Sequence, residues 1–287
     1  DFCLSRGLGD VYKRQHQERR NLKMLEINNI YKTFNPGTVN EKVALNGVSL
    51  KLNDGDFVTV IGGNGAGKST LLNAVAGTWK VDEGSILIDG IDVTKMQDYK
   101  RAKFLGRVFQ DPMMGTVPTM GIDENLALAA RRGKFRGLAR EITAKERAGF
   151  KEIVKILDLG LEDRLTSKVG LLSGGQRQAV TLLMASLKKP KLLLLDEHTA
   201  ALDPKTAAKV LDATETIVNR DHLTTLMITH NMKDAIAHGN RLIMMKDGKI
   251  ILDISGEEKK NLTVEELLEK FNSVGGEDAV NDRMILG

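Results

Sequence analysis

The stretch DFVTVIGGNGAGKSTLLNAVA, residues 56–76, decides the fold. Residues 56–61 predict a strand, a glycine-rich turn follows, and the apolar spacing from Lys68 to Ala76 predicts a helix. Glycines in such a turn let backbone N–H groups point toward phosphate oxygens, and the N-terminus of the following helix adds positive potential. The stretch therefore predicts a phosphate-binding turn between a strand and a helix.

The turn itself, GGNGAGKST at residues 62–70, fits the P-loop pattern G-x-x-x-x-G-K-[ST]. The strand before it and the helix after it distinguish it from a glycine-rich turn without a ligand, which is the alternative. In a P-loop the lysine, Lys68, reaches the β- and γ-phosphates, and the hydroxyl of Ser69 holds Mg²⁺. The expected phosphate-binding residues are Gly62, Asn64, Gly65, Ala66, Gly67, Lys68, Ser69 and Thr70.

A second informative stretch is LLLLDEHTAALDP, residues 192–204. Four leucines predict a strand buried on both faces, as in a parallel sheet. In a P-loop protein, a buried strand that ends in Asp is the Walker B element, so Asp196 is expected to bind Mg²⁺, through water. Glu197 is placed to orient or deprotonate the attacking water. A zinc site is the weaker alternative, because neighbouring side chains point in different directions; His198 is then a loop residue.

A third stretch, LLSGGQRQ at residues 171–178, precedes a predicted helix that runs to about Leu187. Small residues with free N–H groups at a helix start, here Ser173, Gly174 and Gly175, make a second anion site. An ordinary capped helix is the alternative for this stretch taken alone.

The rest of the chain predicts strands alternating with helices, and hence an α/β core with a largely parallel sheet. Its early strands have antiparallel character, and residues 98–180 are a helical stretch that could be inserted into the core. The predicted strands are 25–30, 43–52, 84–90 and 224–229, the predicted helices are 123–131 and 143–157, a hairpin covers 241–254 around Asp247-Gly248, and a capping box joins Thr263 to Glu266.

Composition narrows the function classes. The 287 residues, 41% hydrophobic and 28% charged, suffice for a sizeable core. The single cysteine, Cys3, excludes a disulfide framework and a cysteine-based zinc site. The net charge of +4 is mixed in sign, without a basic stripe and interleaved aromatics, so no nucleic-acid partner is expected. The apolar runs are shorter than the about 20 residues that span a bilayer.

The first residues differ from the rest. Residues 1–15, DFCLSRGLGDVYKRQ, show no periodicity and resemble a translated sequencing adapter, whereas strand-like sequence begins at Leu25. We therefore expect residues 1–23 to be a non-native or disordered leader and the native start to be Met24; a flexible native extension is the alternative.

Together, the P-loop, LSGGQ and Walker B motifs resemble those of the ATP-binding subunits of bacterial ABC transporters, over about residues 24–255. LSGGQ is the signature of that family. The resemblance implies that Gln110 touches Mg²⁺ and the water and senses the membrane subunit, that Asp203 crosses the dimer, and that His230 contacts the γ-phosphate. It implies that Phe34, rather than Tyr31, stacks on adenine. Taken singly, these residues would be a solvated strand end, a helix cap or a core residue.

The resemblance also implies the fold and the site. The expected fold is a P-loop NTPase with a mixed sheet around the P-loop helix, an antiparallel β subdomain, a helical subdomain at about 98–180 and a helical tail at 256–287. The implied cofactors are ATP and Mg²⁺. The catalytic residues would be Lys68, Gln110, Glu197 and His230, the Mg²⁺ ligands Ser69, Gln110 and Asp196, and the residues facing the partner's ATP Ser173, Gly174, Gly175, Gln176 and Asp203.

Partners follow from the same resemblance. Two copies would pack head to tail with ATP between the P-loop of one and LSGGQ of the other, at the cytoplasmic face of the membrane. They would drive a permease served by a solute-binding protein, importing a small solute such as tyrosine or tryptophan. An ATPase that drives mechanical signalling is the alternative. The segment DPMMGTVPTM would dock the permease, or else pack internally, through Met113, Met114, Val117 and Met120.

Two residues depart from the family pattern. His198 stands where proline is usual, which predicts a freely rotating turn with an added titratable group. Gly63 stands where Pro or Ser is common, a small change in the stiffness of the P-loop.

Overall fold

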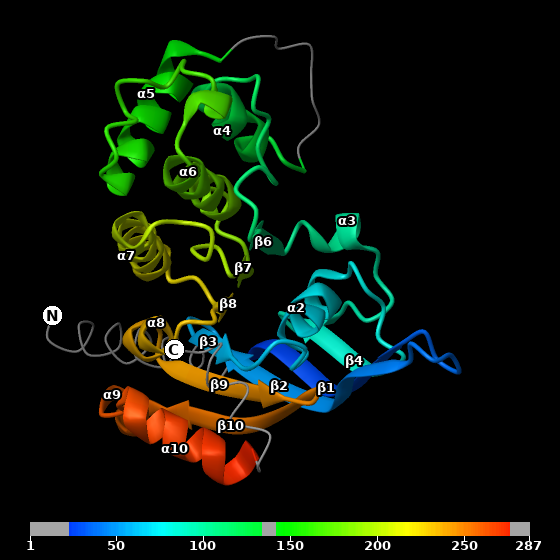
Figure 1. Ribbon diagram of the computed structural model, residues 1–287. Coiled ribbons are helices and arrows are strands. Elements are labelled where there is room, and N and C mark those ends of the chain that lie inside the picture. The colour runs from blue at the N-terminus through cyan, green and yellow to red at the C-terminus, as the bar shows by residue number, and fades with distance from the viewer. Residues whose placement is uncertain (1–22, 134–141, 276–287) are drawn as a thin grey trace, which may run out of the picture.

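The computed structural model describes residues 23–133 and 142–275 (Figure 1). The predictions for residues 1–22 and 276–287 therefore lie outside the described residues. An antiparallel sheet holds the first strands in the order β2-β1-β4-β5. Its strands are β1 (Lys23–Phe34), β2 (Lys42–Asn53), β4 (Glu83–Ile88) and β5 (Ile91–Asp92). The antiparallel character expected for the early strands is confirmed.

A second sheet has six strands in the order β10-β9-β3-β8-β7-β6. Its strands from β9 to β6 run parallel, and only β10 is antiparallel to its neighbour. They are β3 (Phe57–Ile61), β6 (Leu105–Val108), β7 (Leu192–Asp196), β8 (Thr225–Ile228), β9 (Arg241–Lys246) and β10 (Lys249–Ser255). All four leucines of β7 are fully buried, because helices cover both faces of the sheet. The mixed sheet of the predicted fold class is confirmed.

The order of these strands positions the site. Four neighbouring parallel strands, β3, β8, β7 and β6, end at the same edge of the sheet. The P-loop follows β3, His230 lies two residues beyond β8, Asp196 ends β7, and Gln110 lies two residues beyond β6. Ligands of open α/β sheets bind outside the carboxyl ends of the strands. The topology thus gathers motifs that are far apart in the sequence.

Helix α2 (Lys68–Ala76) packs between the two sheets, where its residues Leu71, Leu72 and Val75 join apolar side chains from both. On the other face of the six-stranded sheet lie α6 (Gly174–Ser186) and α7 (Pro204–Asp221), and α4 (Ile122–Ala130) and α5 (Ala144–Val154) pack on α6 around a second apolar cluster. Figure 1 shows α4 and α5 at the end of the molecule opposite the antiparallel sheet.

Within residues 98–180, one strand was not predicted. Beta strand β6 pairs with β7 in the core sheet, after the short helix α3 (Asp98–Arg101). Its four residues, LGRV, are too few to show a period, so the sequence pattern could not distinguish them from the helical residues around them. The helices of this range that lie away from the sheets begin with α4.

The C-terminal elements cover the outer strands. The hairpin β9–β10 turns at Asp247 and Gly248, both with positive φ, as predicted. Helices α8 (Met232–Ala237), α9 (Gly256–Lys260) and α10 (Val264–Gly275) pack beside it around a third apolar cluster. The predicted capping box is confirmed, because Glu266 N donates to Thr263 Oγ1 over 3.2 Å and Thr263 N donates to Glu266 Oε2 over 3.0 Å.

Candidate functional site

The P-loop wraps around the start of α2, and its shape requires glycine. Gly62, Gly65 and Gly67 have φ values of 150°, 82° and 101°. A Cβ atom at Gly62 would lie 2.2 Å from the carbonyl oxygen of Met245, and one at Gly67 would lie 2.5 Å from that of Ala44. Side chains are therefore excluded, and the backbone of the loop can approach a ligand closely.

Lys68 spans the loop from inside. It is 7% exposed, and its Nζ donates to the carbonyl oxygens of Gly62 and Gly63 over 2.7 and 3.1 Å. A buried ammonium group held at the centre of a glycine loop, beside a helix N-terminus, is a site for phosphate. Gly63, which stands where Pro or Ser is common, contributes its backbone carbonyl oxygen to this contact.

A cavity of about 200 Å³ opens on the P-loop. Every expected phosphate-binding residue except Gly62 lines it, together with Phe34 and Glu197. Phe34 makes an edge contact with Trp79, with ring centroids 4.9 Å apart, and Lys32 Nζ lies 5.7 Å from its ring centroid. Tyr31 does not line the cavity. Of the two aromatic candidates for stacking on a base, the structure places Phe34 there. The lining residues are Phe34, Lys42, Ala44, Asn64, Gly65, Ala66, Gly67, Lys68, Ser69, Thr70 and Glu197.

Glu197 lies at the centre of the polar groups beyond β7. Its Oε2 accepts a hydrogen bond from Gln110 Nε2 over 3.3 Å and lies 4.0 Å from His230 Nδ1. Its backbone has a φ of 45°, a left-handed conformation that is unusual for a residue with a side chain. Three of the four residues predicted to be catalytic, Glu197, Gln110 and His230, therefore meet at one carboxylate, and that carboxylate faces the P-loop cavity.

Asp196 is more enclosed than Glu197. Burial raises the pKa of the Asp196 carboxyl above its ordinary value, and the guanidinium of Arg107, 3.6 Å from Asp196 Oδ2, opposes that shift. Burial also lowers the pKa of Arg107. Arg107 remains charged at neutral pH because arginine titrates so high. A half-buried carboxylate beside the guanidinium of Arg107, with the ammonium group of Lys68 also acting on it, is the electrostatic environment of this end of β7.

The oxygen atoms at this edge suit Mg²⁺. Ser69 at the start of α2, the carboxylate of Asp196 and the amide of Gln110 are hard oxygen donors on neighbouring segments. Across the described ranges, no cluster of three or more His, Cys, Asp or Glu side chains could hold a metal ion by itself. Phosphate and water oxygens would complete such a site, as is typical for Mg²⁺.

The LSGGQ residues lie elsewhere. Ser173 is the N-cap of α6: its Oγ accepts from Gln176 N over 3.3 Å, and its N donates to Gln176 Oε1 over 3.2 Å. Asp203 caps α7 by accepting from Thr206 N over 3.1 Å. Ser173, Gly174, Gly175, Gln176 and Asp203 do not line the P-loop cavity. The chain thus brings one set of predicted residues together and leaves the second set apart from it.

His198 corrects an expectation. It is 1% exposed, and its Nε2 lies 3.1 Å from Thr214 Oγ1 on α7, so the turn is anchored and not freely rotating. Burial, with a smaller contribution from His238, lowers the pKa of His198 to about 4. The residue therefore adds no charge at neutral pH. The sequence could not show this, because the packing of α7 over the turn is a tertiary feature.

Three residues of the site escaped the sequence reasoning. Lys42 lines the cavity from the start of β2, and its Nζ would lie 3.0 Å from a Cβ atom at Gly65. Trp79 supports Phe34, and Arg107 contacts Asp196. None belongs to a motif with a fixed pattern. The one available signal was position: Arg107 lies three residues before Gln110 in the segment RVFQDP.

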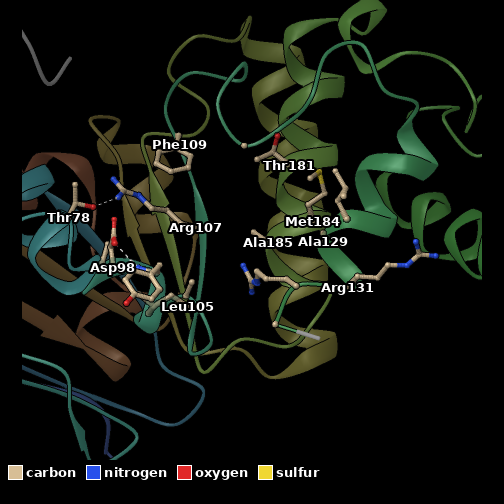
Figure 2. Close-up of a pocket in the computed structure, with 17 residues that line it drawn as sticks. Thr78, Asp98, Leu105, Arg107, Phe109, Ala129, Arg131, Thr181, Met184 and Ala185 are labelled. Carbon is tan, nitrogen blue, oxygen red and sulfur yellow. Dashed lines mark hydrogen bonds between the residues drawn. The ribbon is translucent and has the colours of Figure 1, made fainter. Parts of the chain in front are cut away.

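A larger groove of about 600 Å³ lies between the core sheet and the helical region (Figure 2). Leu105, Arg107 and Phe109 form one wall, and Ala129, Thr181 and Met184 lie opposite. Of the predicted docking residues, Met113, Met114 and Val117 are 49%, 50% and 40% exposed, whereas Met120 is half-buried. The first three are therefore available to a partner, and Met120 packs in part internally.

The described part of the chain contains no helix with the length and hydropathy needed to cross a bilayer.

Comparison with known proteins identifies a family and several relatives. The family model described as "ABC transporter" matches residues 45–200. The tyrosine transport ATP-binding protein of Clostridioides difficile (strain R20291) is 47% identical over 253 residues, which are 86% of this chain and 98% of that protein. The ABC transporter ATP-binding protein YxdL of Bacillus subtilis (strain 168) is 34% identical over 257 residues, 88% of this chain and 95% of that protein.

A solved structure extends the similarity to three dimensions. It is a dimeric post-hydrolysis state of an ATP-binding cassette bound to ADP and Pi, with a TM-score of 0.69 and 31% identity. The match covers 81% of this chain and 98% of that one.

Proposed function

The chain belongs to the ABC transporter family as an ATP-hydrolysing, ATP-binding subunit, and from this premise we propose that it powers the import of a small solute. The observation that carries the proposal is the convergence of the P-loop, Glu197, Gln110 and His230 at one edge of the sheet. In this proposal residues 24–255 form the ATPase domain, residues 98–180 contribute its helical subdomain, and residues 256–287 form the tail.

The proposed chemistry assigns each residue one task. Phe34 stacks on the base, and the P-loop N–H groups with Lys68 hold the phosphates. Ser69, Asp196 and Gln110 hold Mg²⁺, which when bound would neutralise charge developing on the phosphates. Glu197 takes a proton from the attacking water, and Gln110 orients that water beside it. His230, 4.0 Å from Glu197, contacts the γ-phosphate end of the cavity.

The separated LSGGQ residues support an assembly of two copies. One chain carries one P-loop cavity and one signature helix, and the two do not meet within the chain. In a head-to-tail dimer the start of α6 in one copy would complete the ATP site of the other, with Asp203 crossing the interface. ATP then favours the closed dimer, because only the closed form contacts its γ-phosphate from both sides, and hydrolysis reopens it.

The groove beside Phe109 supports a permease as the membrane partner. It is an apolar trough with exposed methionines nearby, and methionine adapts to varied apolar partners. In this proposal the chain works at the cytoplasmic face of the membrane, with a solute-binding protein as an indirect partner. The similarity to a tyrosine transport ATP-binding protein supports an aromatic amino acid as the cargo.

Glu197→Gln tests the two-copy mechanism. Loss of the general base should lower ATP hydrolysis by about 100-fold or more, while ATP and Mg²⁺ remain bound. The variant should therefore accumulate as a dimer with ATP and Mg²⁺, measured by light scattering after gel filtration, and as a monomer with ADP. A variant that binds ATP and stays monomeric would contradict the mechanism.

Purification from detergent-solubilised membranes, together with the products of neighbouring genes, tests the importer. Recovery of a multi-span permease encoded beside a solute-binding protein would support import. Recovery of a membrane protein without a transport path would favour the alternative, an ATPase that drives mechanical signalling, and would leave the nucleotide chemistry intact.

A further inference from the structure

Arg107 on β6 touches four parts of the molecule at once. Its guanidinium lies 3.6 Å from Asp196 Oδ2 on β7 and donates to Asn73 Oδ1 on α2 over 2.8 Å. It also donates to Thr78 Oγ1 over 3.2 Å and lies 4.5 Å from the ring centroid of Phe109. The side chain is 18% exposed. One residue thus joins the P-loop helix, the Walker B carboxylate and the segment that leads to Gln110.

The same side chain forms part of the groove wall. Arg107 and Phe109 both line the groove, and Figure 2 shows the guanidinium reaching from β6 past Phe109 toward Thr78. An occupant that fills the groove on the side of β6 would contact Phe109, and the guanidinium stacks on that ring. The groove and the Asp196 carboxylate are therefore separated by a single side chain.

Arg107 is not explained by packing alone. Its Nε–H is buried and has no hydrogen-bond partner in the part of the chain that the structure describes. Burying an unpaired N–H group is unfavourable, so the hydrogen bonds to Asn73 and Thr78, together with the attraction of Asp196 and Phe109, must offset that cost.

We propose that Arg107 is a positioning residue that links the groove to the Mg²⁺ carboxylate, setting how strongly Asp196 engages the metal. The inference rests on the proposed function, because it takes Asp196 as a metal ligand. While the guanidinium of Arg107 lies beside Asp196, its positive charge repels Mg²⁺ from that carboxylate. A partner that shifts Phe109 would move the guanidinium, release Asp196 and strengthen Mg²⁺ binding. Groove occupancy thereby controls the metal site through one ion pair.

The readout is the factor by which Mg²⁺ strengthens nucleotide binding. The Kd of a fluorescent, non-hydrolysable ATP analogue is measured on the full chain in Mg²⁺ and again in EDTA. The ratio is the Kd in EDTA divided by the Kd in Mg²⁺, so a higher ratio means that Mg²⁺ strengthens binding more. Arg107→Met removes the charge and should raise this ratio about tenfold, since the repulsion at Asp196 is lost. Arg107→Lys keeps a charge on a shorter reach and should leave the ratio within about twofold of the unsubstituted protein. A ratio for Arg107→Met that is unchanged or lower would overturn the proposal.

Phe109→Leu tests the groove side of the link. Removing the ring should loosen the guanidinium and raise the ratio about threefold, and the double variant with Arg107→Met should show no further rise, because both act through the same contact. An unchanged ratio for Phe109→Leu, or additive effects in the double variant, would overturn the role of the groove.

Arg241→Met is the matched control. Arg241 forms an ion pair with Asp253 across β9 and β10, is 19% exposed, and lies outside the nucleotide cavity. Its removal should lower the melting temperature about as much as Arg107→Met and leave the ratio unchanged; a ratio that rose equally would overturn the assignment to Asp196. If the unsubstituted chain binds the analogue in neither buffer, the proposed function fails. If it binds with a Mg²⁺-dependent Kd that Arg107→Met does not alter, only the present inference fails.

Discussion

Helices α2 and α6 both begin with glycine-rich sequence, but they differ in how their N-termini are capped. Gly67, the N-cap of α2, has a φ of 101° and offers no side-chain cap. Ser173, the N-cap of α6, forms a reciprocal capping box with Gln176. The first N–H groups of a helix need partners. At α6 a side chain supplies a partner for one of them, whereas no side chain caps the start of α2.

This difference separates two roles for a helix start. The start of α2 is built around the buried ammonium group of Lys68 and, in the proposed function, would gain stability from bound phosphate. The start of α6 already has its capping box, so in the proposed dimer it would meet the partner's nucleotide as a preformed surface. In the proposed two-copy mechanism, a capped helix would keep its shape when the dimer opens, so the α2 site should change its stability more than α6 with each nucleotide cycle.

Lys68→Ala breaks the α2 side of the comparison and has the largest expected effect. Removing the ammonium group should weaken ATP binding by about 100-fold, since hydrogen bonds to charged groups contribute about 1.5–3 kcal/mol each. Isothermal titration calorimetry with ATP and Mg²⁺ measures it. Lys155→Ala is the control: Lys155 pairs with Glu152 on the surface, and its loss should leave the Kd unchanged. Equal affinity in the two variants would remove Lys68 from the phosphate site.

The next prediction concerns His198, which lies in the segment between β7 and α7. Helix α7 packs on α6. Because burial lowers the pKa of His198 from 6.5 to about 4, the unfolded chain binds a proton more readily than the folded one between these values. The contribution of neutral His198 to the free energy of unfolding is therefore complete above about pH 6.5 and is lost as the pH falls toward 4. The contribution lost between pH 7.5 and pH 5 is about 2 kcal/mol.

Urea unfolding at both pH values measures this loss. His198→Gln should reduce the difference in unfolding free energy between pH 7.5 and pH 5 by that amount, because glutamine does not titrate. Every other titrating group, including His238 with its partner Glu215, is common to both proteins. Identical pH dependence in the two proteins would show that His198 can be protonated where it lies.

Ser173→Ala sharpens the α6 side with the smallest effect. Loss of the cap should cost about 1 kcal/mol of stability. Thr143→Ala is the matched control, because Thr143 forms the same capping box with Glu146 on α5. Both variants should lose similar stability in thermal unfolding, but only Ser173→Ala should weaken ATP-driven dimerisation in the Glu197→Gln background. Equal dimerisation in both would leave α6 with a structural role only.

Patterns with a fixed spacing predicted most of the fold and the contents of the site. The P-loop, the buried strand β7 and the Asp247-Gly248 hairpin each have local sequence signals, and the structure confirms these elements. Strand β6 was not predicted because four residues carry no period. Local pattern also predicted the Thr263 capping box, whose partners lie three residues apart.

The features of the site that the sequence did not predict depend on contacts between segments far apart in the chain. Arg107 gains its role from β7 and α2, which only the strand order brings beside β6. His198 was expected to be mobile because the sequence shows only that proline is absent, and not that Thr214 of α7 lies over it. Lys42 lines the P-loop cavity from the start of β2, which belongs to the antiparallel sheet. Such neighbours have no signature along the chain.

The left-handed backbone of Glu197 has a consequence for how this chain can change. A side chain in that conformation costs roughly 1–2 kcal/mol relative to glycine, which adopts it freely. Glycine at this position should therefore give a more stable protein that lacks the proposed catalytic base. Selection for stability alone should favour glycine at this position, whereas selection for ATP turnover should favour glutamate. Random mutagenesis screened only by heat resistance should therefore enrich inactive variants here.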